Sequence, residues 1–439
     1  MRFAVLTLSL SFFIFFLNGS AGAQQNIVPI DPALERSFET LTARPRVQAA
    51  LSYIEGNEPA YIREQIRLTE IPAPPFKEEK RAAYFLEQMK IRGLNDAYID
   101  SEGNAIGIRP GNGDGPTFLI SAHLDTVFPE GVDTTVELRN GRYYAPGIGD
   151  DTRGLAALLS IIDALNNSNI DTVGDIIFAA NVGEEGRGDL RGIKALFRDF
   201  PEIDGFVSID GVRLRRITTG GTGSRRFEFH FRGPGGHSFG AFGLASPIHA
   251  MGRAIAKIAD IETPQFPKTT YTVGTVEGGT SVNSIAADAI FALDMRSNDK
   301  IELAKLEQKI KAAAMEAVEE ENARWDNGEI TVDFNLIGDR PVGKTQTSSP
   351  IVQAAALAFN EIGLELDQLS ISSTDSNVPM SLGIPAITVA GGGNGGGAHS
   401  PDEWFTPTDS HEGPQTSFLI MLALVGIAEV IEPMLIERD

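Results

Sequence analysis

The 439-residue chain contains no cysteine. Disulfide bonds, thiolate metal ligands and a lipid anchor on an acylated cysteine are therefore excluded. Positive charge is also scarce, because 37 lysines and arginines stand against 59 aspartates and glutamates, for a formal net charge of −22. Nucleic acids and anionic membrane surfaces attract basic patches, so this balance argues against both as partners.

The first residues have the pattern of a secretory signal peptide. Arg2 precedes an apolar run from Phe3 to Leu17, and small and polar residues follow up to an Ala-x-Ala-like cleavage site after Ala23. A membrane anchor is the competing interpretation, but the run is shorter than the ~20 residues of a spanning helix. We predict that residues 1–23 are removed and that the protein is exported to the periplasm or secreted.

The length predicts more than one domain, because single cores stop growing at ~250–300 residues. We predict a main domain formed by residues 24–215 and 341–439, with a second domain inserted at 216–340. The insert reads as β-α-β-β-α-β, the order of a ferredoxin-like α+β unit. Its expected elements are a strand around Phe227, a helix over 247–261, strands over 271–276 and 289–295, a helix over 301–322 and a strand over 330–336.

Four short apolar runs each lead to residues that can bind metal. These are 118–120 before His123 and Asp125, 176–180 before Glu184 and Glu185, 206–209 before Asp210, and 386–389 before His399. Short apolar runs bounded by turn residues read as buried strands, and open α/β sheets build their sites beyond the carboxyl ends of such strands. We therefore expect these side chains at one edge of a mostly parallel sheet flanked by helices.

A fifth segment places Asp150 and Asp151 just before a helical run over 155–162. Imidazole and carboxylate ligands without thiolate suit zinc, manganese or cobalt. A carboxylate has two oxygens and can bridge two metals. Carboxylates at a helix start also act as caps, and this alternative stays open for Asp151 more than for Asp150.

Five motifs in order make the pattern specific. They are Ser-Ala-His-Leu-Asp-Thr-Val at 121–127, Gly-Asp-Asp at 149–151, Gly-Glu-Glu-Gly at 183–186, Gly-Gly-His-Ser at 235–238 and Ala-His-Ser-Pro-Asp-Glu at 398–403. This set resembles the signature of the di-zinc exopeptidase superfamily, which includes tripeptidase T, carnosinase-type dipeptidases, carboxypeptidase G, the aminoacylases and succinyl-diaminopimelate desuccinylase. The resemblance implies a zinc exopeptidase-like catalytic domain whose insert serves as a lid or dimerisation domain.

The same resemblance implies a set of metal ligands. Asp150 would bridge two divalent ions, most simply Zn²⁺, with Co²⁺ or Mn²⁺ as alternatives. His123 and Asp210 would complete one site, and Glu185 and His399 the other.

Further roles follow from the resemblance. Glu184 matches the general base that acts on a metal-bridged water, and Asp125 the carboxylate that orients the imidazole of His123. His237 would reach across a dimer interface and help to bind the oxyanion in the partner's site. A plain surface-turn histidine is the alternative interpretation.

Two residues of the insert match family positions that hold the substrate's carboxylate or the intermediate. These are Asn283 and Arg296. A guanidinium binds carboxylate bidentately, which suits Arg296 to this role. An ordinary ion pair with Asp294 is the alternative for this arginine.

The sequence thus predicts an exported metallo-exopeptidase, and the resemblance implies that it forms a homodimer. Family aminopeptidases and dipeptidases tend to carry aspartate where this chain has Asp210, which favours short peptides with a free amino terminus. Asp-Asp-Thr-Arg at 150–153 departs from the family's usual lysine and leaves the subfamily open. The alternatives are an N-acyl-amino-acid amidohydrolase or carboxypeptidase with the same di-metal site, and a non-catalytic metal-binding protein. The complete ligand set counts against the last.

Overall fold

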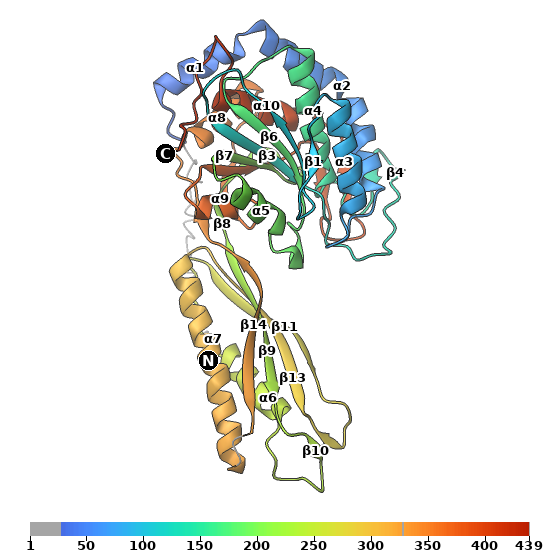
Figure 1. The fold of residues 1–439 in the computed structure, drawn as a ribbon, viewed down its shortest axis with the longest axis vertical. Helices are drawn as coiled ribbons and strands as arrows, with labels where there is room; N and C mark the ends of the chain where they lie inside the picture. Colours follow the sequence, from blue (N-terminus) through green and yellow to red (C-terminus); the bar gives the residue numbers. More distant parts are fainter. Residues whose placement is uncertain (1–27, 327–328, 439) are drawn as a thin grey trace, which may run out of the picture.

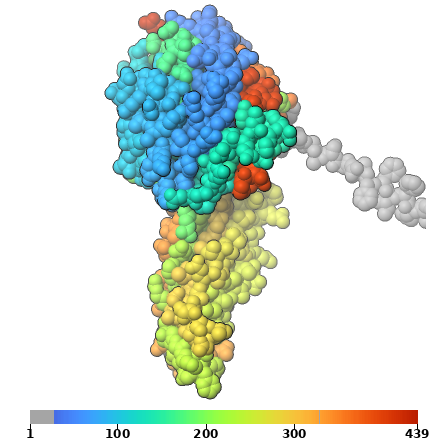
Figure 2. All heavy atoms as spheres, turned by 90° about the vertical axis from the view of Figure 1, so that its right-hand side faces the viewer, coloured from blue at the N-terminus to red at the C-terminus, as the bar shows by residue number. Residues whose placement is uncertain are grey.

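The computed structural model describes residues 28–326 and 329–438, so the predicted signal peptide over 1–23 lies outside the described part. Two α/β units make up this part, a main unit and an insert (Figure 1). Figure 2 shows the insert as a narrower lobe that extends from the main unit. Within the described ranges, none of the helices combines the length and the hydrophobicity needed to cross a bilayer.

A nine-stranded sheet forms the centre of the main unit. Its strands are β1 (Tyr98–Ile99), β2 (Ala105–Arg109), β3 (Thr117–His123), β6 (Asp175–Asn181), β7 (Ile203–Ile209), β8 (Arg216–Gly221), β15 (Gly343–Lys344), β16 (Gln368–Ser372) and β17 (Ala386–Val389). They run in the order β1-β2-β6-β3-β7-β17-β8-β15, and β16 pairs with β8. The central strands β6, β3, β7 and β17 are parallel neighbours. The predicted α/β class with a mostly parallel sheet is confirmed.

Helices cover both faces of this sheet. One face carries α1 (Pro32–Thr42), α2 (Pro45–Thr69), α3 (Glu79–Ile91), α4 (Thr152–Asn167), α8 (Pro350–Glu361) and α10 (Glu412–Val425), and the other α5 (Arg191–Asp199) and α9 (Asn377–Ser381). Successive side chains of a strand point to opposite faces. Phe118 and Ile120 accordingly join the first core, whereas Leu119 joins the second. All seven residues of β7 are buried, as expected for a strand covered on both sides.

A small antiparallel sheet lies beside the carboxyl edge of the parallel strands, where the candidate metal ligands are expected. It consists of β4 (Glu137–Arg139), β5 (Arg142–Tyr144), β18 (Asn394–Gly396) and β19 (Trp404–Thr406), in the order β18-β19-β5-β4. Because β5 and β19 pair, the segment before Asp150 lies next to the one that carries His399. This sheet therefore brings together two ligands that are far apart in the sequence.

The insert has the predicted ferredoxin-like order. Its elements are β9 (Gly223–Arg232), α6 (Pro247–Ala259), β11 (Thr269–Gly278), β13 (Asp288–Ser297), α7 (Lys300–Trp325) and β14 (Thr331–Arg340), with a short ladder between β10 (Gly236–His237) and β12 (Ser284–Ile285). The antiparallel sheet runs β11-β13-β9-β14. The predicted start at residue 216 falls in β8, which belongs to the main sheet, so the insert's own sheet begins at Gly223. A single residue, Thr222, separates the two strands, and no turn signal marks the change.

Aromatic packing holds the insert together. Phe229 stacks on Phe291 with ring centroids 4.5 Å apart, and Phe334 meets Phe229 edge to face at 5.1 Å. Phe229 and Phe291 are both fully buried in a core that is separate from those of the main unit. The insert thus has its own source of hydrophobic stabilisation.

We predict that Phe229→Ala destabilises the insert by ~3–5 kcal/mol, because the truncation removes buried ring surface and leaves a cavity. Urea denaturation followed by circular dichroism measures the change. Phe266→Ala is the matched control, because that ring is 90% exposed and its loss should cost little. Equal stability of the two variants would contradict the packing described above.

Candidate active site

The predicted ligands gather at the carboxyl edge of the parallel strands. His123 is the last residue of β3, and Asp210 directly follows β7. Glu184 and Glu185 lie in the loop after β6, which is the other neighbour of β3. Adjacent parallel strands end at the same edge, so their loops meet there.

Two imidazoles approach the two oxygens of one carboxylate. Nε2 of His123 lies 3.0 Å from Oδ1 of Asp150, and Nε2 of His399 lies 3.2 Å from Oδ2. Nε2 of His399 also lies 2.9 Å from Oε1 of Glu185. Ligand atoms of His123, Asp150 and Glu185 all lie within 4.8 Å of one another. Asp150 thus lies between the two imidazoles, where the predicted bridging ligand would have to be.

Asp210 and His399 titrate far from their usual ranges in the metal-free chain. Burial, followed by the nearby Asp150, raises the pKa of Asp210 to about 7. Hydrogen bonds to Asp150 and Glu185 raise the pKa of His399 to about 10. Burial dominates the first shift and neighbouring carboxylates the second, and divalent cations would offset the negative charge at both positions. The donor set of imidazoles and carboxylates therefore fits a pair of such ions.

The loops around this centre are fixed by buried carboxylates. Nδ1 of His123 donates to the backbone carbonyl of Asp125 at 3.0 Å, which leaves Nε2 free for a metal. The Asp125 carboxylate lies farther from Nδ1, at 3.7 Å. Instead it accepts from the backbone N–H groups of Glu184, at 3.0 Å, and Glu185, at 2.8 Å. Asp125 therefore positions the glutamate loop as well as the imidazole.

Asp151 has the capping role that the sequence left open. Its Oδ1 accepts from the backbone N–H of Gly154 at 3.1 Å, at the start of α4. The same carboxylate accepts from the backbone N–H groups of His123, at 3.2 Å, and Gly211, at 3.3 Å. Asp151 is fully buried, and burial raises its pKa. It joins three of the segments that carry ligands.

Sequence reasoning assigned no role to Glu403, although this residue closes the motif at 398–403. Its carboxylate accepts from the backbone N–H groups of Gly147 at 2.9 Å, Gly149 at 2.8 Å and Asp150 at 3.0 Å. Burial, followed by the charge of Asp150, raises the pKa of Glu403 to about 7. Glu403 therefore holds the loop that presents the bridging carboxylate.

Arg153 explains the unusual Asp-Asp-Thr-Arg segment. The side chain is fully buried, and Nη1 lies 2.9 Å from Oε1 of Glu58. Nε donates to the carbonyl of Gly391 at 2.6 Å. The N–H of Gly391 in turn donates to the carbonyl of Gly211, next to Asp210, at 2.8 Å. This arginine thus ties the start of the glycine loop to the helices and to a ligand segment, and only its departure from the family pattern pointed to it.

Arg340, the last residue of β14, was also missed. Nη1 donates to Oε1 of Glu184 at 3.2 Å and to Oγ of Ser373 at 3.1 Å, and Nη2 bonds the backbone carbonyl of Glu184. Burial raises the pKa of Glu184, and Arg340 opposes the shift. The predicted base is therefore held by a residue that lies between insert and main unit, where no sequence pattern marks it.

A cavity of about 390 Å³ opens at this centre and includes Asp150, Glu184, Asp210 and His399. Arg296 also lines it, while its Nε donates to Oδ2 of Asp294 at 2.8 Å. The ion pair with Asp294 is therefore present, and Arg296 also reaches the cavity in which a substrate would lie.

His237 and Asn283 do not line this cavity. Both are exposed at the β10–β12 ladder, where the N–H of Ser238 donates to the carbonyl of Asn283 at 3.0 Å. Figure 1 places β10 at the end of the insert that points away from the main unit. Within one chain, neither residue meets the metal centre.

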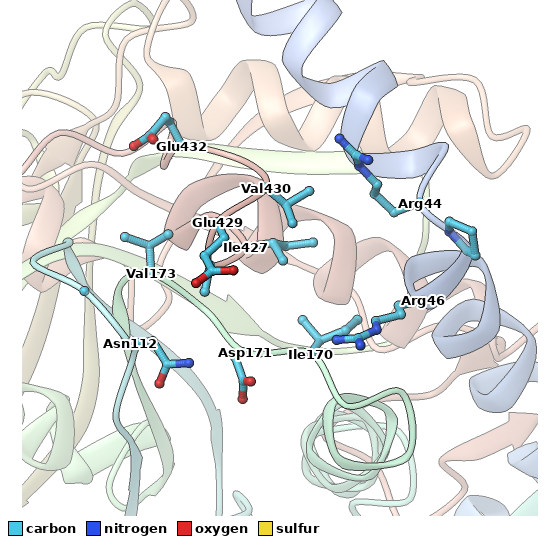
Figure 3. Close-up of a pocket in the computed structure, with 13 residues that line it drawn as sticks. Arg44, Arg46, Asn112, Ile170, Asp171, Val173, Ile427, Glu429, Val430 and Glu432 are labelled. Atoms are coloured by element: carbon cyan, nitrogen blue, oxygen red, sulfur yellow. The ribbon is translucent and has the colours of Figure 1, made fainter.

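A larger cavity, of about 820 Å³, lies at the opposite edge of the sheet (Figure 3). Its lining includes Asn112 before β3, Val173 before β6 and Ile427 after α10. Arg44 and Arg46 face Glu429 and Glu432 across it, so its charges are mixed. None of the predicted site residues lines it, and the smaller cavity is therefore the candidate active site.

An α/β fold that gathers imidazole and carboxylate side chains at the carboxyl edge of its sheet fits the class of metal-dependent hydrolases. The chain belongs to the peptidase family M20/M25/M40, whose sequence profile matches residues 119–422. The predicted superfamily is thereby confirmed.

Relatives by sequence include a protein of Bacillus subtilis (strain 168), the uncharacterized protein YqjE, which is 29% identical over 302 residues, or 66% of this chain and 76% of the relative. Succinyl-diaminopimelate desuccinylase of Nitrosococcus oceani is 26% identical over 213 residues, or 44% of this chain and 57% of the relative.

Solved structures share the fold. Aminopeptidase PepT from Bacillus cereus superposes with a TM-score of 0.65 at 22% identity, covering 83% of this chain and 98% of that one. The YXEP protein of Bacillus subtilis, described as a dinuclear metal binding peptidase, gives 0.61 at 17% identity, with 84% and 99% covered.

We predict that metal binding releases protons from the metal-free chain. Ligands must be deprotonated to bind, and the pKa is about 7 for Asp210 and about 10 for His399. The apparent affinity for Zn²⁺ should therefore rise as the pH increases through about 7. Titration calorimetry at one pH, in buffers of different ionisation enthalpy, measures the released protons.

His230→Gln is the control for this measurement, because His230 lies on β9 outside the cavity. This variant should release the same number of protons as the wild type. A binding heat that does not depend on the buffer would contradict the prediction.

Proposed function

We propose that this protein is an exported zinc exopeptidase that hydrolyses short peptides. The observation that carries the proposal is the placement of Glu184, which is buried beside the metal ligands and faces the same cavity. A carboxylate that is free of metal and next to a two-metal centre is suited to general-base chemistry. The choice of peptides with a free amino terminus is favoured by the aspartate at position 210.

When bound, two divalent cations would polarise the scissile carbonyl and acidify water. His123, Asp150, Glu185, Asp210 and His399 would hold them.

Glu184 then takes the proton of the attacking water and returns it to the leaving amine. Its burial raises the pKa, which strengthens it as a base, and Arg340 keeps the carboxylate oriented. Asp125 fixes the backbone of the same loop. Each chain therefore contributes a base whose position is set by both units.

The second candidate function is hydrolysis of N-acyl amino acids. It is supported by the similarity to succinyl-diaminopimelate desuccinylases, whose name describes an N-acylated amino acid as substrate. A carboxypeptidase would use the same residues. Assays on unblocked peptides and on N-acyl amino acids distinguish these activities.

We predict that Glu184→Gln lowers kcat on unblocked di- and tripeptides by about 10²–10⁴-fold, because the general base is lost. Metal content should stay at the wild-type value, since this residue is not among the proposed ligands. Release of free amino acid and metal analysis measure the two effects.

Glu87→Gln is the matched control, because Glu87 is exposed on α3 and should keep full activity. Full activity of Glu184→Gln would refute the role of the base. Cleavage of N-acyl amino acids alone would favour the second candidate.

The proposal includes a homodimer in which His237 serves the partner's active site. It is supported by the exposed apolar side chains beside this histidine, Phe239, Phe242 and Val282, which are at least 77% exposed. An apolar surface of this kind is typical of an interface. His237 would then donate to the oxyanion that forms in the other subunit.

Mixing two inactive variants tests this arrangement. In a hybrid dimer of Glu184→Gln and His237→Ala chains, one site combines an intact Glu184 with the partner's intact His237. We expect each variant alone to be impaired and the refolded mixture to regain activity, with dimers in sedimentation. A mixture no more active than its parts would contradict the shared site.

Export is proposed on the amino-terminal pattern alone. Amino-terminal sequencing of the protein from the periplasm or medium should begin at Gln24. An intact Met1 on cytoplasmic protein would overturn it.

A further inference from the structure

The active-site cavity is unusually cationic away from the metal centre. Four of its lining residues are arginines, namely Arg216, Arg226, Arg296 and Arg340. Its remaining lining is mostly polar, with hydroxyl groups from residues 372–374 and Thr388, and Val127 is the one hydrocarbon side chain among the described lining residues. Such walls offer little to an apolar group and much to an anion.

Two carboxylates of the protein, Glu184 and Asp294, compensate two of the four positive charges. Arg340 faces Glu184 at 3.2 Å. Arg226 and Arg296 share one carboxylate, because their Nε atoms lie 2.9 Å and 2.8 Å from the two oxygens of Asp294. The carboxylates of the candidate metal centre are left out of this count, because the divalent cations that they would hold would compensate them.

Among the described residues, no carboxylate pairs with the fourth arginine, Arg216. Its guanidinium makes no ion pair or hydrogen bond among the residues that the structure describes, although the residue is partly buried. It begins β8, whose neighbour β17 contributes Thr388 to the cavity. Arg216 therefore belongs to the main unit, whereas Arg226 and Arg296 belong to the insert. The uncompensated charges lie on two walls of one cavity.

We propose that the substrate is a dicarboxylate and that Arg216 binds its second carboxylate. This inference rests on the proposed hydrolase function and names its substrate class: short peptides whose carboxy-terminal residue is aspartate or glutamate. The insert arginines would take one carboxylate and Arg216 the other. A planar guanidinium with no competing partner binds a carboxylate through two parallel hydrogen bonds. It repels basic substituents, and a neutral substituent leaves its charge unpaired.

Pairs of peptides that differ only in charge test the proposal on turnover. We expect kcat/KM to be about 10- to 100-fold higher for Ala-Glu than for Ala-Gln, a range that corresponds to one charged hydrogen-bonded contact. Arg216→Gln should collapse this ratio, and Arg216→Lys should restore part of it. Arg213→Gln removes the same charge from an exposed neighbour outside the cavity and should keep the ratio.

Ligand binding supplies a test that does not need turnover. Calorimetry on the zinc-loaded chain should show that glutarate binds at least about tenfold more tightly than butyrate, and that Arg216→Gln removes the difference. Inorganic phosphate should bind more weakly than glutarate.

The outcomes separate the two hypotheses. If no peptide is cleaved but glutarate shows the Arg216-dependent preference, the proposed reaction fails and the dicarboxylate site stands. If peptides are cleaved with Ala-Glu and Ala-Gln treated alike, or if glutarate and butyrate bind alike, the dicarboxylate site is wrong. Tighter binding of phosphate than of glutarate would also overturn it.

Discussion

Crowding of buried negative charge at one sheet edge is the constraint on which the rest of the structure depends. Asp150 and Glu185 lie close to two imidazoles and Asp210 lines the same cavity, where burial, followed by the charge of Asp150, raises the pKa of Asp210 to about 7. Burying carboxylates this close together is costly unless cations accompany them. This edge is therefore suited to bind divalent metal, and such ions activate water and polarise carbonyl groups for hydrolysis.

Carboxylates of another kind hold this edge in place. Asp125, Asp151 and Glu403 bind backbone N–H groups of the ligand loops rather than metal. Arg153 joins the glycine loop to α2 through Glu58. Loops without regular hydrogen-bond ladders would otherwise leave polar groups unpaired, so these contacts satisfy the backbone and fix the ligand geometry together.

The insert affects the chemistry as well as the shape of the molecule. Through Arg340 its last strand reaches Glu184, and through Arg226 and Arg296 its sheet forms a cationic wall of the cavity. Its far end carries His237 and Asn283, too far from the chain's own metal centre to line it. The two ends of this unit thus differ: one contacts the proposed base within the chain, and the other is exposed and would meet the partner only in the proposed homodimer.

The sequence by itself determined the class of fold and the family and named the candidate metal ligands, because strand patterns and short motifs such as that around His123 are local. The β-α-β-β-α-β order of the insert was equally readable from alternation and helical periodicity. The tertiary structure was needed to assign roles to three arginines. Arg340 and Arg153 contact Glu184 and Gly391, which come from distant segments. The cavity that Arg216 lines is likewise built from distant segments. The sequence specifies the charge of each side chain. Whether an opposite charge compensates it depends on which segments the tertiary structure places beside it.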